Sequence, residues 1–216
     1  MSNYKLIIFD FDGTIVDSSP GIYNTANWSV KQLGLKEETN TNQLRKFIGP
    51  PLKDCFKYTY NLDDKYIDEA CDIYRKRYFE KGQYDVKVFD GIEDVLLSLK
   101  EKGYILAIAT MKYREIVFSM LKYLNLAKYF DYIDGTNIEG TKYKAEILNE
   151  IILHFNIDKK NSILIGDTYH DESAAIESEI DFLAVSYGFG FNEKSKINSS
   201  MIGIAPSTSD ILSYIL

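Results

Sequence analysis

Two aspartates separated by one residue follow an apolar run near the start of the chain. The run at 5–9 shows no polar alternation, which is typical of a central strand that is buried on both faces of a parallel sheet. It leads into the sequence DFDGT at 10–14. Because side chains alternate along an extended chain, Asp10 and Asp12 should point to the same side. Two such carboxylates repel each other, and a hard cation that prefers oxygen ligands would relieve the repulsion.

A hydroxyl group follows a second apolar run. The sequence YILAIA at 104–109 is typical of a buried strand, and Thr110 comes directly after it. Because the carboxyl ends of parallel strands meet at one edge of the sheet, the Thr110 hydroxyl can lie at the same edge as Asp10.

A third apolar run, SILI at 162–165, precedes another pair of carboxylates. Asp167 follows this run after one glycine, and Asp171 lies four residues later in the opening of a helix. One carboxylate at a strand tip and one a helical turn away suit a magnesium site that keeps several waters. We expect Asp167 to bind the metal directly and Asp171 to bond a metal-bound water or a lysine. Compensation of the helix N-terminus would also explain Asp171.

The elements that must position these residues alternate between strand and helix. A further apolar run at 181–185 and a short β run at 130–133 alternate with three helical faces, at 92–99, 116–124 and 147–155. This alternation predicts an α/β fold, a doubly wound parallel-sheet (Rossmann-like) core with helices on both faces. Residues 16–87 contain amphipathic helical patterns and no convincing strand. We therefore predict a core domain of residues 1–15 and 88–216, with residues 16–87 inserted as an α-helical domain.

These motifs together resemble those of haloacid-dehalogenase-superfamily phosphatases, close to the phosphoglycolate phosphatase branch, and the resemblance covers essentially the whole chain. It implies that Asp10 is the nucleophile and Asp12 the general acid/base. It also implies that Thr110 bonds a phosphoryl oxygen and that residues 16–87 form the small helical cap domain of the family. Mg²⁺ is the implied cofactor, with Asp10, the backbone carbonyl of Asp12, and Asp167 as its ligands.

A cation for the phosphoryl group is the remaining requirement of this chemistry. The family resembled here places a lysine at the start of the helix after the third strand. Two lysines compete in the sequence GTKYKAEIL. Lys144 lies three residues before Ile147, where the apolar helical face begins, and fits better than Lys142.

Charge and composition narrow the classes of partner. The net charge of −7 and the isoelectric point near 5.0 argue against nucleic acid or an anionic membrane as a general partner. The start of the chain lacks the long apolar core of a signal peptide, and no apolar run reaches the length of a membrane span. Cys55 and Cys71 have no metal-ligand spacing. We expect a cytoplasmic protein that acts on a small phosphorylated metabolite, and no pattern indicates its oligomeric state.

The predicted activity is a Mg²⁺-dependent phosphatase that hydrolyses small phosphomonoesters, of which phosphoglycolate is the model, through an aspartyl-phosphate. Pyrophosphatase and 5′-nucleotidase activities are alternatives that use the same chemistry. Asp12 argues against a dehalogenase, which needs no acid/base there. The segment FIGPPLKD at 47–54 resembles phosphoglycolate phosphatases more than phosphomutases. A binding protein that has lost catalysis is a further alternative, which the presence of all four motifs disfavours.

Overall fold

The structure is a computed structural model, and it describes residues 3–137, 140–192 and 194–216 of the 216-residue chain. The chain forms two compact units. The first combines Met1–Asp17 with Val88–Leu216, and we call it the core unit. The second is Ser18–Lys87, and we call it the helical insertion. The two crossings between them run through two short paired strands, β2 (Val16–Asp17) and β3 (Lys87–Val88).

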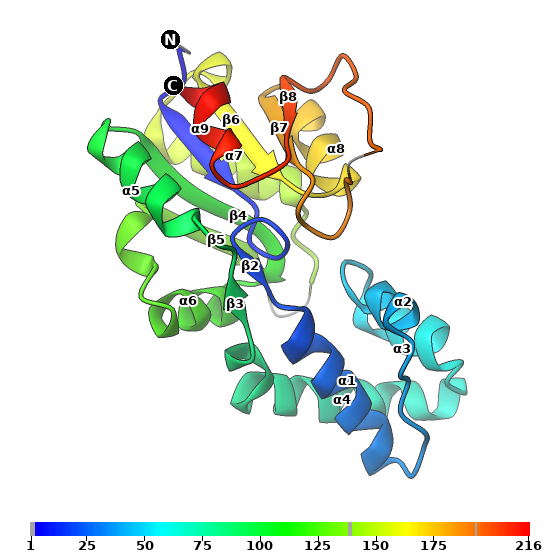
Figure 1. The fold of residues 1–216 in the computed structure, drawn as a ribbon. Helices are drawn as coiled ribbons and strands as arrows, with labels where there is room; N and C mark the ends of the chain where they lie inside the picture. The colour runs from blue at the N-terminus through cyan, green and yellow to red at the C-terminus, as the bar shows by residue number, and fades with distance from the viewer. Residues whose placement is uncertain (1–2, 138–139, 193) are drawn as a thin grey trace. The chain divides into compact units, whose positions relative to one another are not determined.

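The core unit is built on a six-stranded sheet whose strands are all parallel (Figure 1). In the order in which they pair, the strands are β5 (Tyr132–Thr136), β4 (Ile105–Tyr113), β1 (Leu6–Phe9), β6 (Ser162–Gly166), β7 (Asp181–Val185) and β8 (Gly203–Ala205). After β1 the chain builds one side of the sheet with β4 and β5, and then crosses to the other side with β6. The strand order therefore reverses around β1, and in doubly wound folds ligands bind at the carboxyl ends of the strands near such a point.

Helices cover the sheet, as the doubly wound prediction requires. In chain order they are α5 (Ile92–Glu101), α6 (Arg114–Tyr123), α7 (Lys144–Phe155), α8 (Tyr169–Ser178) and α9 (Asp210–Ile215). Short 3-10 turns occur at Ala127–Tyr129 and Lys159–Asn161. The apolar faces expected at 92–99, 116–124 and 147–155 become the buried faces of α5, α6 and α7.

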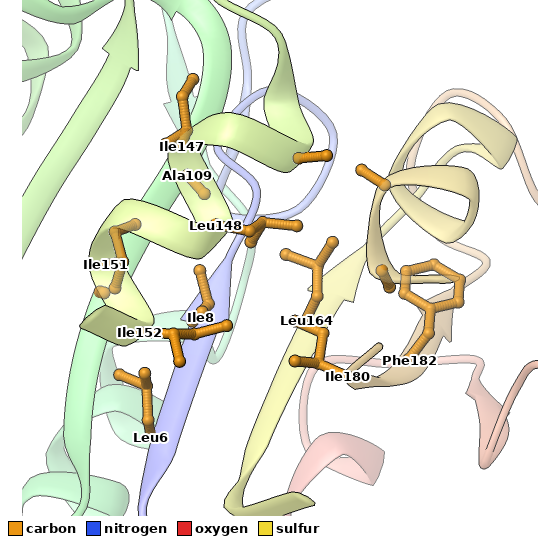
Figure 2. Packing of buried hydrophobic residues seen from close by; sticks show 14 of the residues in the cluster. Leu6, Ile8, Ala109, Ile147, Leu148, Ile151, Ile152, Leu164, Ile180 and Phe182 are labelled. Carbon is orange, nitrogen blue, oxygen red and sulfur yellow. The ribbon is translucent and has the colours of Figure 1, made fainter. Parts of the chain in front are cut away.

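One face of the sheet packs against α7 and α8. Figure 2 shows Ile147, Leu148 and Ile151 of α7 directed toward the side chains of β1 and neighbouring strands. From β1, Leu6 and Ile8 contribute to this cluster, which suits the alternation of side chains along a strand. Because every β1 residue is fully buried, the segment that leads into Asp10 is held in a dense apolar environment.

The sheet differs from the sequence prediction at two strand ends. The structure places β5 at Tyr132–Thr136, two residues later than the expected start, and β4 continues past Thr110 to Tyr113. The pairing of β4 with β5 shifts register between Thr110 and Tyr113. This irregularity allows β4 to extend, and it is not visible in the apolar pattern because residues 111–113 are more exposed than those before them.

The helical insertion contains α1 (Ser19–Gln32), α2 (Thr41–Leu44), α3 (Leu52–Tyr60) and α4 (Asp64–Glu80), with 3-10 turns at Arg45–Phe47 and Gly82–Tyr84. Pro20 lies in the first turn of α1, where a missing N–H costs nothing. An aromatic cluster packs inside the unit, made of Phe47, Phe56, Tyr60 and Tyr74. None of the helices that the structure describes is long and apolar enough to span a membrane.

Candidate active site

A buried ion-pair network lies at the carboxyl end of β1. The backbone N–H of Asp10 donates to the carbonyl of Ile165 in β6 at 2.8 Å, which keeps this residue paired within the sheet. Lys144, the first residue of α7, places its Nζ 2.6 Å from Asp10 Oδ1 and also donates to Asp171 Oδ1. All three side chains are buried. Segments that are 134 residues apart in the chain thus meet at one carboxylate.

Burial and charge oppose each other in this network. Burial raises the pKa of Asp10 well above its ordinary value, against the lowering effect of the Lys144 ammonium, and the carboxylates of Asp171 and Asp167 raise it further. Burial would lower the pKa of Lys144, but the charges of Asp10 and Asp171 outweigh burial and raise it. Lys144 therefore stays a cation among three buried carboxyl groups, and two of these, Asp10 and Asp167, have raised pKa values.

Asp167 follows β6, and within the described part of the chain one of its two carboxyl oxygens accepts a hydrogen bond. Its Oδ2 accepts a hydrogen bond from the backbone N–H of Phe189 at 2.7 Å. Its Oδ1 is buried and has no hydrogen-bond partner among the residues described. A Cβ at Gly13 would lie 2.2 Å from Asp167 Oδ2, and Gly13 has a φ of +88°, so only glycine allows this close approach. Burial, followed by the charge of Asp171, raises the pKa of Asp167 to about 7.

Asp171 is fixed on both oxygens. While Oδ1 accepts from Lys144, Oδ2 accepts from the backbone N–H of Thr168 at 2.9 Å and from its hydroxyl at 2.7 Å. Thr168 and Asp171 form a capping box at the start of α8. The sequence offered two separate explanations for Asp171, a contact with a lysine and a role at the helix N-terminus. In the structure its side chain does both, since it contacts Lys144 and caps the start of α8.

The site is suited to a divalent cation. Asp10, Asp167 and Asp171 each offer a carboxylate oxygen, and these oxygens lie within 4.8 Å of one another. Asp171 is already engaged, whereas Asp167 Oδ1 is a buried carboxyl oxygen with no hydrogen-bond partner in the described part of the chain. A hard cation that prefers oxygen ligands would satisfy it. Asp10 and Asp167 are thus the side chains best placed as ligands. A cation bound here would also favour the ionised forms of these carboxylates.

Asp12 is paired with a residue to which the sequence assigned no role. Lys112 Nζ lies 3.0 Å from both Oδ1 and Oδ2 of Asp12. Lys112 is the second residue after Thr110, in the extension of β4 beyond the predicted strand. A lysine two residues after a strand-terminal threonine was visible in the sequence. Its contact with Asp12 was not, because it depends on the irregular end of β4.

Thr110 is buried, and its hydroxyl takes part in a hydrogen bond within β4. The Oγ1 atom accepts a hydrogen bond from the backbone N–H of Lys112 at 3.1 Å. Since the hydroxyl acts as acceptor there, its hydrogen can be directed toward another oxygen. Lys142, the competing lysine, donates instead to Asp134 at 2.8 Å and Glu150 at 2.6 Å. The structure therefore brings Lys144, and not Lys142, to Asp10.

The loop after β7 encloses the site from a further side. Besides the Phe189 N–H at Asp167, the Tyr187 hydroxyl donates to the carbonyl of Thr14 at 3.0 Å. Tyr187 also packs edge-to-face against Phe89. The contact at Asp167 comes from a backbone N–H, which leaves no residue-type signal in the sequence.

Comparisons with known proteins agree with this arrangement. Residues 7–185 match the model of the family described as haloacid dehalogenase-like hydrolase. A 5′-nucleotidase from Pseudomonas aeruginosa is 32% identical over 192 residues, which cover 88% of this chain and 86% of that protein. A phosphoglycolate phosphatase from Aquifex aeolicus is 32% identical over 178 residues, with 79% of each chain covered.

A solved structure is similar over the full length. A haloacid dehalogenase-like family protein from Streptococcus pneumoniae is 34% identical, with a TM-score of 0.89 and complete coverage of both chains. The match therefore includes the core unit and the helical insertion. From the family match, these relatives and the shared fold, we conclude that the chain belongs to the haloacid dehalogenase-like hydrolase family.

Proposed function

We propose that the protein is a Mg²⁺-dependent phosphatase that hydrolyses small phosphomonoesters through an aspartyl-phosphate on Asp10. The observation that supports this most is the setting of Asp10. Its buried carboxyl group has Lys144 on one oxygen, and nearby lies an Asp167 oxygen that has no hydrogen-bond partner among residues 3–137, 140–192 and 194–216. Such a cluster is costly to fold, and buried, perturbed carboxylates of this kind gather at active sites.

In the first step an Asp10 oxygen attacks phosphorus and forms a new P–O bond. The bond between phosphorus and the ester oxygen breaks on the opposite side, and its electron pair leaves with that oxygen. Asp12 donates a proton to the departing oxygen, so an alcohol is released. Lys144 and Thr110 hold the phosphoryl oxygens, through an ammonium and through the hydroxyl hydrogen that the Lys112 N–H leaves available.

In the second step Asp12, now ionised, removes a proton from a water molecule. The resulting hydroxide attacks the phosphorus of the aspartyl-phosphate, and the bond to Asp10 breaks. Inorganic phosphate leaves, and both aspartates return to their starting forms. Mg²⁺, held by Asp10, Asp167 and the carbonyl of Asp12, would supply positive charge that offsets repulsion between the nucleophile and the phosphate.

The substrate proposal rests on the relatives as well as on the site. Phosphoglycolate is favoured because a phosphoglycolate phosphatase is among the 32% identical relatives and because the chain resembles that branch. A nucleoside monophosphate is the second candidate, since a 5′-nucleotidase is equally similar and covers more of the chain. Both are phosphomonoesters, and both fit the same two steps.

Release of phosphate from p-nitrophenyl phosphate by the purified protein tests the proposal. We expect activity with Mg²⁺, none in excess chelator, and recovery when Mg²⁺ is restored. Calcium should inhibit, because its looser and larger coordination disturbs in-line geometry. Full activity in chelator would show that the metal assignment is wrong. A panel of phosphorylated metabolites, including phosphoglycolate and nucleoside monophosphates, then identifies the preferred leaving group.

A further inference from the structure

A second lysine lies two residues before Lys144, and the proposed reaction steps do not use it. Lys142 Nζ donates to Asp134 Oδ2 at 2.8 Å and to Glu150 Oε2 at 2.6 Å. Asp134 belongs to β5 and Glu150 to α7, so this ammonium connects the strand with the helix that carries Lys144. The side chain of Asp134 is 7% exposed and that of Glu150 is 55% exposed, so the contact with the strand is the more protected of the two.

The same strand also fixes the backbone of Lys142. The Thr136 hydroxyl donates to the Lys142 carbonyl at 3.1 Å. Because side chains alternate along a strand, Asp134 and Thr136 lie on one face of β5, where the first holds the side chain of Lys142 and the second its backbone. The Tyr143 N–H then donates to Glu146 Oε2 at 2.8 Å. The chain is thus held by β5 immediately before α7, and by its own side chain within the first turn of α7.

The stability of α7 does not explain a lysine at this position. The N-terminus of a helix carries partial positive charge, which disfavours a cation nearby. Lys142 and Lys144 both lie at this end of α7. The pair with the buried Asp134 costs desolvation, and the pair with the exposed Glu150 contributes little. Lys142 therefore suits a role in placing the start of α7 better than a role in stabilising the helix.

Lys144 depends on a well-placed start of α7. Its Nζ contacts Asp10 at 2.6 Å and also donates to Asp171. A lysine ammonium ends a flexible four-carbon stem, so where it lies is decided by the backbone from which the stem begins. Lys144 is the first residue of α7, and a shift of the helix start would move its ammonium away from both carboxyl groups.

We propose that Lys142 is a positioning residue that ties the start of α7 to β5 and thereby holds the Lys144 ammonium at Asp10. Its effect on catalysis rests on the proposed function. Asp134 is the partner that matters most, because it is buried and belongs to the strand. Glu150 matters less, since it is exposed and lies on the helix that is being placed.

The first test measures kcat/KM for p-nitrophenyl phosphate and the inhibition constant of inorganic phosphate. Lys142→Met should change each unfavourably by about 10-fold, within the loss of up to about 10²-fold that a misplacement of about 1 Å can cause. Lys142→Arg should retain most of the activity, because it keeps a charge between the two carboxylates. Lys159→Met is the matched control: Lys159 lies beyond the other end of α7, pairs with Glu179 at 2.9 Å and is 43% exposed. An unchanged Lys142→Met would overturn the inference.

A double-variant cycle with Lys144→Met shows whether Lys142 acts through Lys144. If it does, Lys142→Met causes no further loss once Lys144 is replaced, whereas residues that act independently cause losses that multiply. Equal losses in the two backgrounds would overturn the inference. Because Lys142→Met alone leaves Asp134 without its ammonium and can impair folding, the cycle is repeated with Asp134→Asn present. The loss due to Lys142→Met should be the same there.

Crystal structures separate failure of this inference from failure of the proposed function. In Lys142→Met with Asp134→Asn we expect Lys144 Nζ to have left hydrogen-bonding distance of Asp10 Oδ1, whereas Lys159→Met should keep this contact. Such a displacement would support the positioning role even if the wild type proved inactive. An unchanged contact would overturn the inference, and an active wild type would then leave the phosphatase proposal standing.

Discussion

The core unit buries some of its ion pairs, whereas the ion pairs described in the helical insertion lie on the surface. In the core unit, Lys144 and its two aspartate partners are almost wholly removed from water. In the insertion, ion pairs such as Lys53–Asp68 lie on the surface, with side chains that are 61% and 80% exposed. Exposed pairs contribute little to stability, and a buried pair can cost more than it returns. Burial of charge, and not its presence, therefore distinguishes the candidate site from the rest of the molecule.

The largest expected effect comes from removing the buried carboxylate of the core unit. Asp10→Asn changes charge but little volume, so the protein should fold while phosphatase activity falls by about 10⁴-fold or more. Asp68→Asn makes the same change on the surface of the insertion and should leave kcat/KM unaltered. Steady-state kinetics with p-nitrophenyl phosphate compare the two variants. Near wild-type activity in Asp10→Asn would show that burial of charge does not mark the nucleophile here.

The insertion should be sensitive at its aromatic cluster instead. Phe56 is fully buried, and its ring centroid lies 4.9 Å from that of Phe47. Phe56→Ala should destabilise the insertion by about 3–5 kcal/mol, the usual cost of deleting a buried aromatic side chain. Tyr58→Ala on the same helix is the control, because Tyr58 is 67% exposed.

Amide hydrogen exchange resolves where this loss is felt. We expect faster exchange in α3 and α4 of Phe56→Ala, with protection of β1 and β6 unchanged. An equal loss of protection in β1 would show that the two units unfold as one, and it would contradict their separation.

A smaller effect is expected on the stability of the metal-free core unit. Burial raises the pKa of Asp167 from an ordinary 3.8 to about 7, so between these values the folded chain holds a proton that the unfolded chain lacks. The contribution of Asp167 to the stability of the folded chain therefore falls as pH rises from about 4 to 7. Asp167→Asn cannot ionise and escapes this loss. In chelator, the Tm of Asp167→Asn should exceed that of wild type by a larger margin at pH 8 than at pH 5. Each kcal/mol of difference in the free energy of unfolding corresponds to about 2–4 °C in Tm.

Thermal melts at both pH values, with and without Mg²⁺, check this expectation. Mg²⁺ should raise the Tm of wild type at pH 8 and have little effect on Asp167→Asn, which lacks the proposed ligand. A difference in Tm that does not change with pH would contradict the assigned cost of burying Asp167.

Much of the core unit followed from the sequence because its signals are local. Unbroken apolar runs predicted the central strands, and the apolar face beginning at Ile147 distinguished Lys144 from Lys142 as the residue that opens α7. The contact of Lys112 with Asp12 was not predictable, since it depends on a register shift late in β4. The Phe189 N–H is a backbone group and has no residue-type signal. In the insertion, aromatic periodicity predicted helices and packing but carried no information on substrate.

Rapid-quench analysis of Asp12→Asn can detect the proposed covalent phosphate on Asp10. This variant keeps Asp10 but lacks the group that activates water, so the aspartyl-phosphate formed from p-nitrophenyl phosphate should accumulate. General acid/base catalysis contributes about 10²–10⁴-fold, and hydrolysis of the intermediate should slow by that order. Peptide mapping after quenching should locate the phosphate on Asp10. Turnover in Asp12→Asn without a phospho-enzyme, or with the phosphate on another residue, would contradict the proposed aspartyl-phosphate mechanism.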